Sequence, residues 1–208
     1  IRGAGNLLGS EQSGCIASVG FDLYCQLLKE AVDERRGVTQ DRKIESPVVD
    51  LPVNAFIPDS YITNSGIKME MYRKISKLEK IEDMGALIDE FKDRFGALPK
   101  ELLNLMEILK MKLLAWDLDS PYVKENKGQV HILLPGVTAI NLRILQDIYN
   151  KTGVVPRFER SLLMLQNIYK ISKKTLVPKV DYSKPDEWMP RIIKVLEYLV
   201  HLRKEKKI

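Results

Sequence analysis

The sequence predicts an α+β fold: a C-terminal domain with a small, mostly antiparallel sheet packed by helices, preceded by a loop-helix segment. One observation predicts this class, and a second predicts that the chain is folded. Segments with helical periodicity alternate along the chain with short β-branched segments, and short turns join the latter. Of the 208 residues, 45% are hydrophobic and 29% charged, which is typical of a globular chain and excludes disorder as its main state.

The N-terminal part predicts a loop followed by one helix. Residues 1–20 hold five of the twelve glycines, which favours a loop. Apolar residues then recur at helical spacing: Phe21, Tyr24, Leu27, Leu28, Ala31 and Val32. Arg35-Arg36-Gly37 ends this helix with cations and a glycine stop. Residues 37–46 are polar and aperiodic, so we place a linker and the domain boundary there.

The next part predicts one strand and three helices. Residues 48–56 have the composition of a strand, and because Pro47, Pro52 and Pro58 flank or interrupt it, we predict an edge strand. Apolar spacing predicts helices over 67–80 and 83–95. A third helix follows Pro99. It is apolar over a wide arc, which predicts the central core helix.

The last part predicts a hairpin, two further strands and two helices. The hairpin covers 121–134, with its turn at 125–128. A helix over 138–151 follows. Two strands are predicted near 154–158 and 162–168. A final amphipathic helix opens at Lys184-Pro185-Asp186.

The net charge of +5 is unevenly distributed. Residues 1–159 carry 21 basic and 23 acidic side chains, whereas residues 160–208 carry 12 basic and 5 acidic ones. The basic end could be a nucleic-acid footprint, or exposed helix ends where cations favour the helix dipole. We favour the second interpretation, because aromatic residues are sparse there and no known nucleic-acid motif is present.

Two cysteines are too few to build a disulfide scaffold, and two cysteines with two histidines leave too few ligands to favour a zinc site. The two cysteines are Cys15 and Cys25, and the two histidines, His131 and His201, are on candidate core elements without a nearby nucleophile. We interpret both histidines as structural. No phosphate-binding G-x-x-x-x-G-K-[ST] motif occurs, and the Gly3/Gly5 pair lacks a preceding strand. We therefore expect no metal, no cofactor and no catalysis in this chain.

Two further observations concern the setting of the chain. No apolar run approaches the ~20 residues that span a bilayer, so no membrane association is expected. The chain opens at Ile1-Arg2-Gly3 without a methionine or an apolar leader, which suggests a cut within a longer protein and no signal peptide.

Three stretches carry a resemblance to a known family. The first is Arg2-Gly3-Ala4-Gly5-Asn6-Leu7-Leu8-Gly9-Ser10-Glu11-Gln12-Ser13-Gly14, followed by Val19-Gly20-Phe21-Asp22-Leu23-Tyr24, Leu27-Leu28 and Ala31-Val32. The second is Leu51-Pro52-Val53-Asn54-Ala55-Phe56-Ile57-Pro58-Asp59-Ser60-Tyr61-Ile62 with Tyr72-Arg73-Lys74-Ile75, and the third is Asp93-Arg94-Phe95-Gly96-Ala97-Leu98-Pro99. The first resembles the translocation motif of the bacterial transcription-repair coupling factors, whose core the helicase RecG shares. The other two resemble the C-terminal domain of the same family.

The resemblance implies a domain organisation. Residues 1–36 would be the tail of a second RecA-like translocase lobe, 37–46 a linker, and 47–208 a C-terminal regulatory domain. The parent would be an ATP-dependent DNA translocase of the bacterial cytoplasm, with ATP and magnesium bound in motor lobes that this chain lacks. It would displace stalled RNA polymerase and recruit the excision-repair protein UvrA. The regulatory domain would mask the parent's own UvrA-recruiting region and restrain the motor.

The resemblance also implies site residues. The translocation motif, which would contact duplex DNA, maps onto Arg2, Gly3, Gly5, Gly9, Gln12, Ser13 and Gly14. A guanidinium at Arg2 could hold the hairpin of the motif through a bidentate contact. The Gln12 amide could bind and release a phosphate without reading sequence. For the regulatory domain, the interdomain contact residues that we select are Arg73, Lys74, Asp93 and Arg94. Within the Asp93–Gly96 stretch we expect Phe95 to be buried and Gly96 to turn the chain.

Three functional hypotheses follow. The first, which we favour, is a regulatory interaction domain without enzymatic activity. The second is a DNA-binding module that uses the basic C-terminal stretch. The third, a small hydrolase, lacks convergent titratable groups in the sequence.

Overall fold

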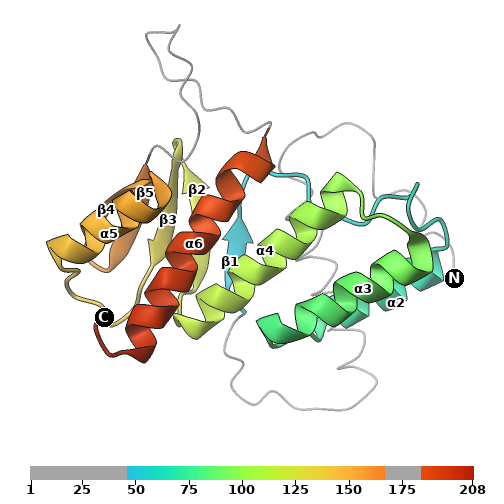
Figure 1. Cartoon of the computed structure of the whole chain (residues 1–208), viewed down its shortest axis with the longest axis horizontal. Helices are drawn as coiled ribbons and strands as arrows, with labels where there is room; N and C mark the ends of the chain where they lie inside the picture. Colours follow the sequence, from blue (N-terminus) through green and yellow to red (C-terminus); the bar gives the residue numbers. More distant parts are fainter. Residues whose placement is uncertain (1–45, 167–183) are drawn as a thin grey trace, which may run out of the picture.

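The computed structural model describes residues 46–166 and 184–208 (Figure 1). The elements, in chain order, are β1 (Val48–Asp50), α2 (Ser65–Ser76), the 3-10 turn η1 (Ile81–Asp83), α3 (Met84–Phe95), α4 (Lys100–Asp117), β2 (Tyr122–Asn126), β3 (Gln129–Leu133), α5 (Leu142–Thr152), β4 (Val155–Glu159), β5 (Leu162–Gln166) and α6 (Pro185–Lys204). The α+β class is confirmed.

The sheet has the strand order β1-β2-β3-β5-β4. All neighbours are antiparallel except β1 and β2, which pair in parallel with Val49 opposite Val123. β1 is an edge strand, as its prolines predict. The β2–β3 hairpin turns at Lys127 and Gly128, both at positive φ (51° and 82°), which matches the twist of the two strands.

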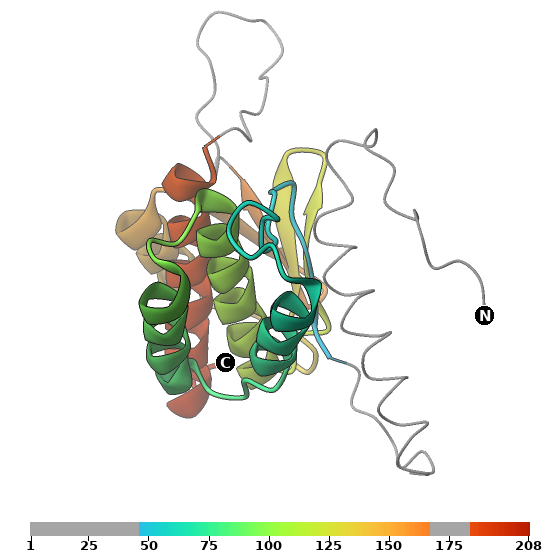
Figure 2. The same ribbon diagram turned by 90° about the vertical axis from the view of Figure 1, so that its right-hand side faces the viewer.

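Helices α4, α5 and α6 pack on one face of the sheet, while α2 and α3 lie beside α4, away from α5 (Figures 1 and 2). Successive side chains along each strand point to opposite faces of the sheet. Val123, Ile132 and Leu163 lie opposite one another on adjacent strands and are fully buried against the helices. α4 alone buries nine side chains, so it is the core helix that the sequence predicts, and it packs along α6.

The predicted strand over 48–56 is wrong beyond Asp50. Pro52 lacks the N–H that a ladder needs, and the chain leaves the sheet there. Residues 51–62 instead form an irregular segment whose alternate side chains enter the core; those that are buried are Leu51, Val53, Ala55, Ile57 and Ile62. The second stretch of the family resemblance is therefore a buried strap across the helices.

Two long-range hydrogen bonds fix this strap. The backbone N–H of Ile57 donates to Tyr72 Oη at 2.9 Å, inside the protein. Asn104, which is buried on α4, donates from Nδ2 to the Asn54 carbonyl at 2.8 Å. The strap is thus tied to both α2 and α4 by groups that belong to distant parts of the sequence.

Removing the Tyr72 hydroxyl should destabilise the domain. Tyr72→Phe leaves the buried Ile57 N–H without this acceptor, which costs about 1–3 kcal/mol of the free energy of unfolding. Urea denaturation measures the loss. Tyr149→Phe, which removes a hydroxyl from an exposed ring, is the matched control and should change little. Equal effects of the two variants would contradict the role of the strap.

Several predicted boundaries differ from the structure. The helix predicted from 67 begins at Ser65, because Asn64 caps it by accepting from the Ile67 N–H at 3.0 Å, and it ends at Ser76. The helix predicted from 138 begins only at Leu142, after the cap Asn141. The predicted N-terminal loop, helix and linker lie outside the described residues, apart from position 46.

Candidate interdomain interface

Helices α2 and α3 present one charged face, and their apolar residues explain why. Met71 and Ile75 of α2 are fully buried, as is Phe91 of α3. With these side chains in the core, the polar residues between them point outward. Of the large apolar side chains that are exposed in the described part of the chain, none is on α2 or α3. We call the outward surface formed by Glu70, Arg73, Lys74, Glu90, Asp93 and Arg94 the α2–α3 face.

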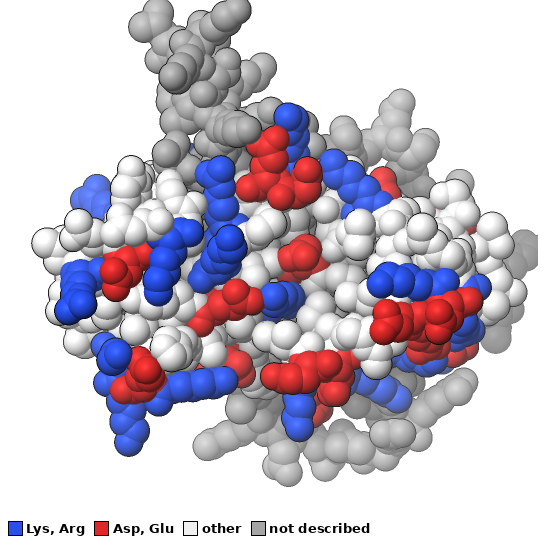
Figure 3. Space-filling model, in the orientation of Figure 1, with Lys and Arg blue, Asp and Glu red and all other residues white. Residues whose placement is uncertain are grey.

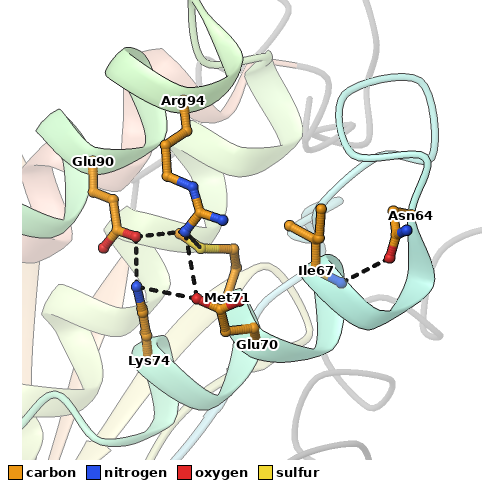
Figure 4. Close-up of polar contacts among 7 residues, drawn as sticks. All are labelled: Asn64, Ile67, Glu70, Met71, Lys74, Glu90 and Arg94. Atoms are coloured by element: carbon orange, nitrogen blue, oxygen red, sulfur yellow. Dashed lines mark hydrogen bonds and ion pairs between the residues drawn. The ribbon is translucent and has the colours of Figure 1, made fainter.

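Four charged side chains of this face form a network between the helices (Figure 4). Glu90 Oε1 accepts hydrogen bonds from Lys74 Nζ at 2.5 Å and from Arg94 Nη1 at 2.7 Å. Glu70 Oε1 lies 3.3 Å from Lys74 Nζ and 3.4 Å from Arg94 Nη1. Each cation therefore faces both carboxylates, and the network carries no net charge.

The network shifts the protonation of its members. Hydrogen bonds from Lys74 and then from Arg94 hold the pKa of Glu90 below its ordinary value. The hydrogen bond to Glu90 raises the pKa of Lys74 above its ordinary value. Both shifts favour the charged forms, so the network is fully formed at neutral pH.

The lowered pKa of Glu90 predicts a pH dependence of stability. A carboxylate with a lower pKa in the folded state stabilises the fold above its unfolded pKa of about 4.3, and this stabilisation disappears as the pH falls through the folded value. Glu90→Gln should therefore lose less stability than the wild type between pH 6 and pH 3 (roughly the range in which carboxylates titrate). Urea midpoints at several pH values measure this. Asp89→Asn, on the same helix but outside the network, is the control, and an equal change in both variants would contradict the assignment.

The structure brings together two of the four contact residues that the sequence selects. Lys74 and Arg94 are in the network, whereas Arg73 and Asp93 are exposed on the same helices, and neither has an ion-pair partner among the described residues. Sequence reasoning missed Glu70 and Glu90. Their four-residue spacing to Lys74 and Arg94 is the signal that could have found them.

The stretch around Phe95 packs against Tyr61 and has a structural role. Phe95 is half-buried, and its ring contacts that of Tyr61 with the centroids 5.8 Å apart. The Tyr61 hydroxyl donates to the carbonyls of Phe91 at 3.0 Å and of Gly96 at 2.9 Å. Gly96 has φ of 87°, a conformation that favours glycine, and it ends α3. This tyrosine holds the C-terminal end of α3 in place.

The other candidate residues do not form a second site. The translocation-motif residues, from Arg2 to Gly14, lie outside the described residues. His131 on β3 is half-buried on the sheet face opposite the helices, and His201 on α6 is exposed beside Glu205, so both lie on core elements, as expected, with side chains outside the core. The described ranges hold no group of three potential metal ligands. None of the helices in those ranges has the length and hydropathy needed to cross a bilayer.

Three cations of the basic C-terminal stretch are paired where the structure describes it. Arg203 binds the Asp119 carboxylate and donates to the Leu118 carbonyl at 2.6 Å. Lys207 pairs with Glu205 at 2.6 Å, and Lys184 with Glu187 at 3.2 Å. Arg203 thus joins α6 to the end of α4, whereas the other two pairs lie at the ends of α6 itself.

Comparison with known proteins places the chain in a family. Its fold resembles a crystal structure of the C-terminal domain of a transcription-repair coupling factor, with a TM-score of 0.59, 20% identity, and coverage of 76% of this chain and 94% of that one. The model of the TRCF domain family matches residues 51–145. The transcription-repair-coupling factor of Bacillus subtilis is 34% identical over 207 residues, 99% of this chain and 17% of that protein. The one from Staphylococcus aureus is 41% identical over 193 residues, 88% of this chain and 16% of that protein.

The chain belongs to the family of transcription-repair-coupling factors and contains its C-terminal domain. It spans less than a fifth of the length of these curated relatives. The names of these relatives agree with the family that the sequence resemblance indicates.

Proposed function

We propose that this chain is the regulatory end of an ATP-dependent DNA translocase that displaces stalled RNA polymerase and recruits UvrA. Residues 47–208 mask the parent's own UvrA-recruiting region and restrain the motor until polymerase is engaged. The family membership and the resemblance of residues 2–14 to a translocation motif support this proposal. ATP hydrolysis and DNA translocation belong to the motor lobes, and this chain supplies the restraint.

The observation that supports a clamp most directly is the character of the α2–α3 face. Two well-packed helices hold it, so its geometry is preformed. It is charged, and among the described residues it shows no large exposed apolar side chain. Interfaces between domains that must separate are more polar than permanent ones. Arg73 and Asp93 are exposed without ion-pair partners in the described chain, and they would pair across the contact.

Binding in trans tests the clamp. This chain should bind the separately produced UvrA-recruiting region of its parent at micromolar concentration, with an affinity that falls as salt rises. Arg73→Glu should weaken binding severalfold because it replaces an exposed cation of the α2–α3 face. Lys127→Glu, in the exposed β2–β3 turn, is the matched charge-reversal control. Absence of binding, or equal weakening by both variants, would contradict the proposed contact.

A further inference from the structure

One face of the sheet is covered by no helix of the described residues. Helices α4, α5 and α6 pack on the other face, and Figure 2 shows both sides of the sheet. Successive side chains of a strand point to opposite faces. The strand residues next to the buried Val123, Ile132 and Leu163 therefore lie on the uncovered face, and none of them is buried. We call the sheet face opposite these three helices the open face.

An apolar row crosses the open face where the chain enters the sheet. Val48 of β1 is opposite Tyr122 of β2, and Leu133 of β3 is opposite Leu162 of β5. The register of β2 and β3 continues the row from Tyr122 to Leu133. Val48 is 40% exposed, and the other three side chains are half-buried. Since neighbouring strands are about 4.8 Å apart, the row extends over about 14 Å. We call these four residues the apolar row.

The charges of the open face compensate one another. Lys124 of β2 is opposite Asp50 of β1, and its Nζ lies 5.3 Å from the centroid of the Tyr122 ring. Arg157 Nη2 lies 3.8 Å from Glu159 Oε2 on β4. Two cations thus accompany two carboxylates, whereas charges of both signs are spread widely over the helix side of the molecule (Figure 3). A nucleic-acid backbone requires an excess of Lys and Arg, so the open face favours an apolar partner.

The part of the chain that precedes β1 contains a segment of matching character. Residues 21–36 lie outside the described residues, and their sequence predicts a helix with one apolar side. Phe21, Tyr24, Leu28 and Val32 are spaced by three or four residues, so they would form one stripe along this helix. A helix of this length extends over about 24 Å, which is enough to cover the apolar row.

The linker allows this segment to reach the open face. Residues 37–46 separate the segment from β1, and an extended chain of this length reaches about 33 Å. β1 is an edge strand, and Val48, its first residue, belongs to the apolar row. The chain therefore enters the sheet beside the surface to be covered. A short flexible tether gives an effective concentration of about millimolar, so even a weak apolar contact would be populated.

We propose that residues 21–36 dock as a helix on the open face, with their apolar stripe over the apolar row. Burial of apolar surface would drive this contact. This segment fits better than a separate protein because it is tethered beside the row. The contact would join the part of the chain that resembles a translocase lobe directly to the regulatory domain. It goes beyond the clamp proposed above, since it uses neither the α2–α3 face nor the UvrA-recruiting region.

Paramagnetic broadening of NMR signals in the whole chain tests this contact. Cys15→Ser and Cys25→Ser remove the two native cysteines, and Glu30→Cys introduces one on the side of the segment opposite the stripe. A nitroxide is attached to this cysteine, and the backbone amides of the isotope-labelled chain are followed. We expect amides of β2, β3 and β5 to lose most of their signal. Amides of α6, on the other side of the sheet, should keep theirs.

A matched pair of variants tests the role of the apolar stripe. Leu28→Asp places a charge within the stripe and should abolish the broadening of the strands. Gln26→Asp adds the same charge on the other side of the segment and should leave the broadening unchanged. Neither residue belongs to the described domain, so its amide spectrum reports in each case that the fold is intact.

A second pair of variants tests the apolar row itself. Leu162→Gln, on the open face, should reduce the broadening. Leu103→Gln changes an exposed leucine of α4, on the helix side, and should not reduce it.

Four results would overturn the proposal. The first is absent or uniform broadening in the nitroxide-labelled chain, and the second is an equal effect of Leu28→Asp and Gln26→Asp. The third is the same broadening when nitroxide-labelled chain without isotope is mixed with isotope-labelled chain without nitroxide, which would assign the open face to a contact between two copies. The fourth is loss of the broadening on addition of single-stranded DNA that shifts the same amides, which would make the open face a nucleic-acid surface.

Discussion

Replacing Phe91 with alanine is expected to lower the free energy of unfolding by about 3–5 kcal/mol. Phe91 is fully buried on α3, and its ring contacts those of Tyr61 and Phe95, with centroids 6.4 Å and 6.2 Å away. The smaller side chain would leave a cavity beneath both α3 and the end of the buried strap. A loss of this size is a large part of the 5–15 kcal/mol that typically stabilises a domain.

Equilibrium unfolding in urea, followed by circular dichroism, measures this loss. Leu103→Ala is the matched control, since Leu103 is about half-exposed on α4 and its truncation should cost little. The Phe91→Ala variant should also bind the UvrA-recruiting region more weakly, because α3 carries half of the α2–α3 face. A stability change of less than 1 kcal/mol (roughly the value for a surface substitution) would show that the aromatic cluster does not hold α3 in place.

Deleting residues 47–208 from the full-length parent is expected to raise its rate of ATP hydrolysis on duplex DNA. A restraint exerted through domain contacts has a coupling free energy of 1–3 kcal/mol, or roughly 5- to 150-fold. Steady-state ATPase assays of the intact and shortened proteins measure the change. Adding this chain back in trans should restore part of the restraint, whereas the Arg73→Glu variant should restore less. An unchanged rate after the deletion would contradict the restraining role.

Local sequence signals predicted the elements whose boundaries depend on local chemistry. The β2–β3 turn follows from Lys127-Gly128, and the end of α3 follows from Gly96. The edge position of β1 follows from its prolines. In each case, backbone conformational preference and hydrogen bonding within a few residues decide the outcome.

The features that escaped prediction depend on contacts between distant residues. The parallel pairing of Val49 with Val123 joins segments more than 70 residues apart, and no local pattern encodes it. The stretch after Asp50 was predicted as a strand from its composition, yet its alternate buried residues belong to a strap held by Tyr72 and Asn104. Pro52 interrupts the ladder locally, and hydrogen bonds from distant residues then hold the stretch as a strap.

The candidate site shows the same division. Arg73, Lys74, Asp93 and Arg94 were selected from the stretches of family resemblance, and the structure brings Lys74 and Arg94 together and leaves Arg73 and Asp93 exposed on the same two helices. The sequence could not show that Lys74 and Arg94 are paired while the other two are not. Both pair with Glu90, and the packing of α2 on α3 brings Lys74 within reach of that carboxylate.

Binding of UvrA to the full-length parent, with and without residues 47–208, tests the central claim most directly. If this domain masks the UvrA-recruiting region, the shortened protein should bind UvrA at least about fivefold more tightly than the intact protein in the absence of RNA polymerase. Adding this chain in trans should then reduce the binding again. Equal affinity of the intact and shortened proteins for UvrA would contradict the claim.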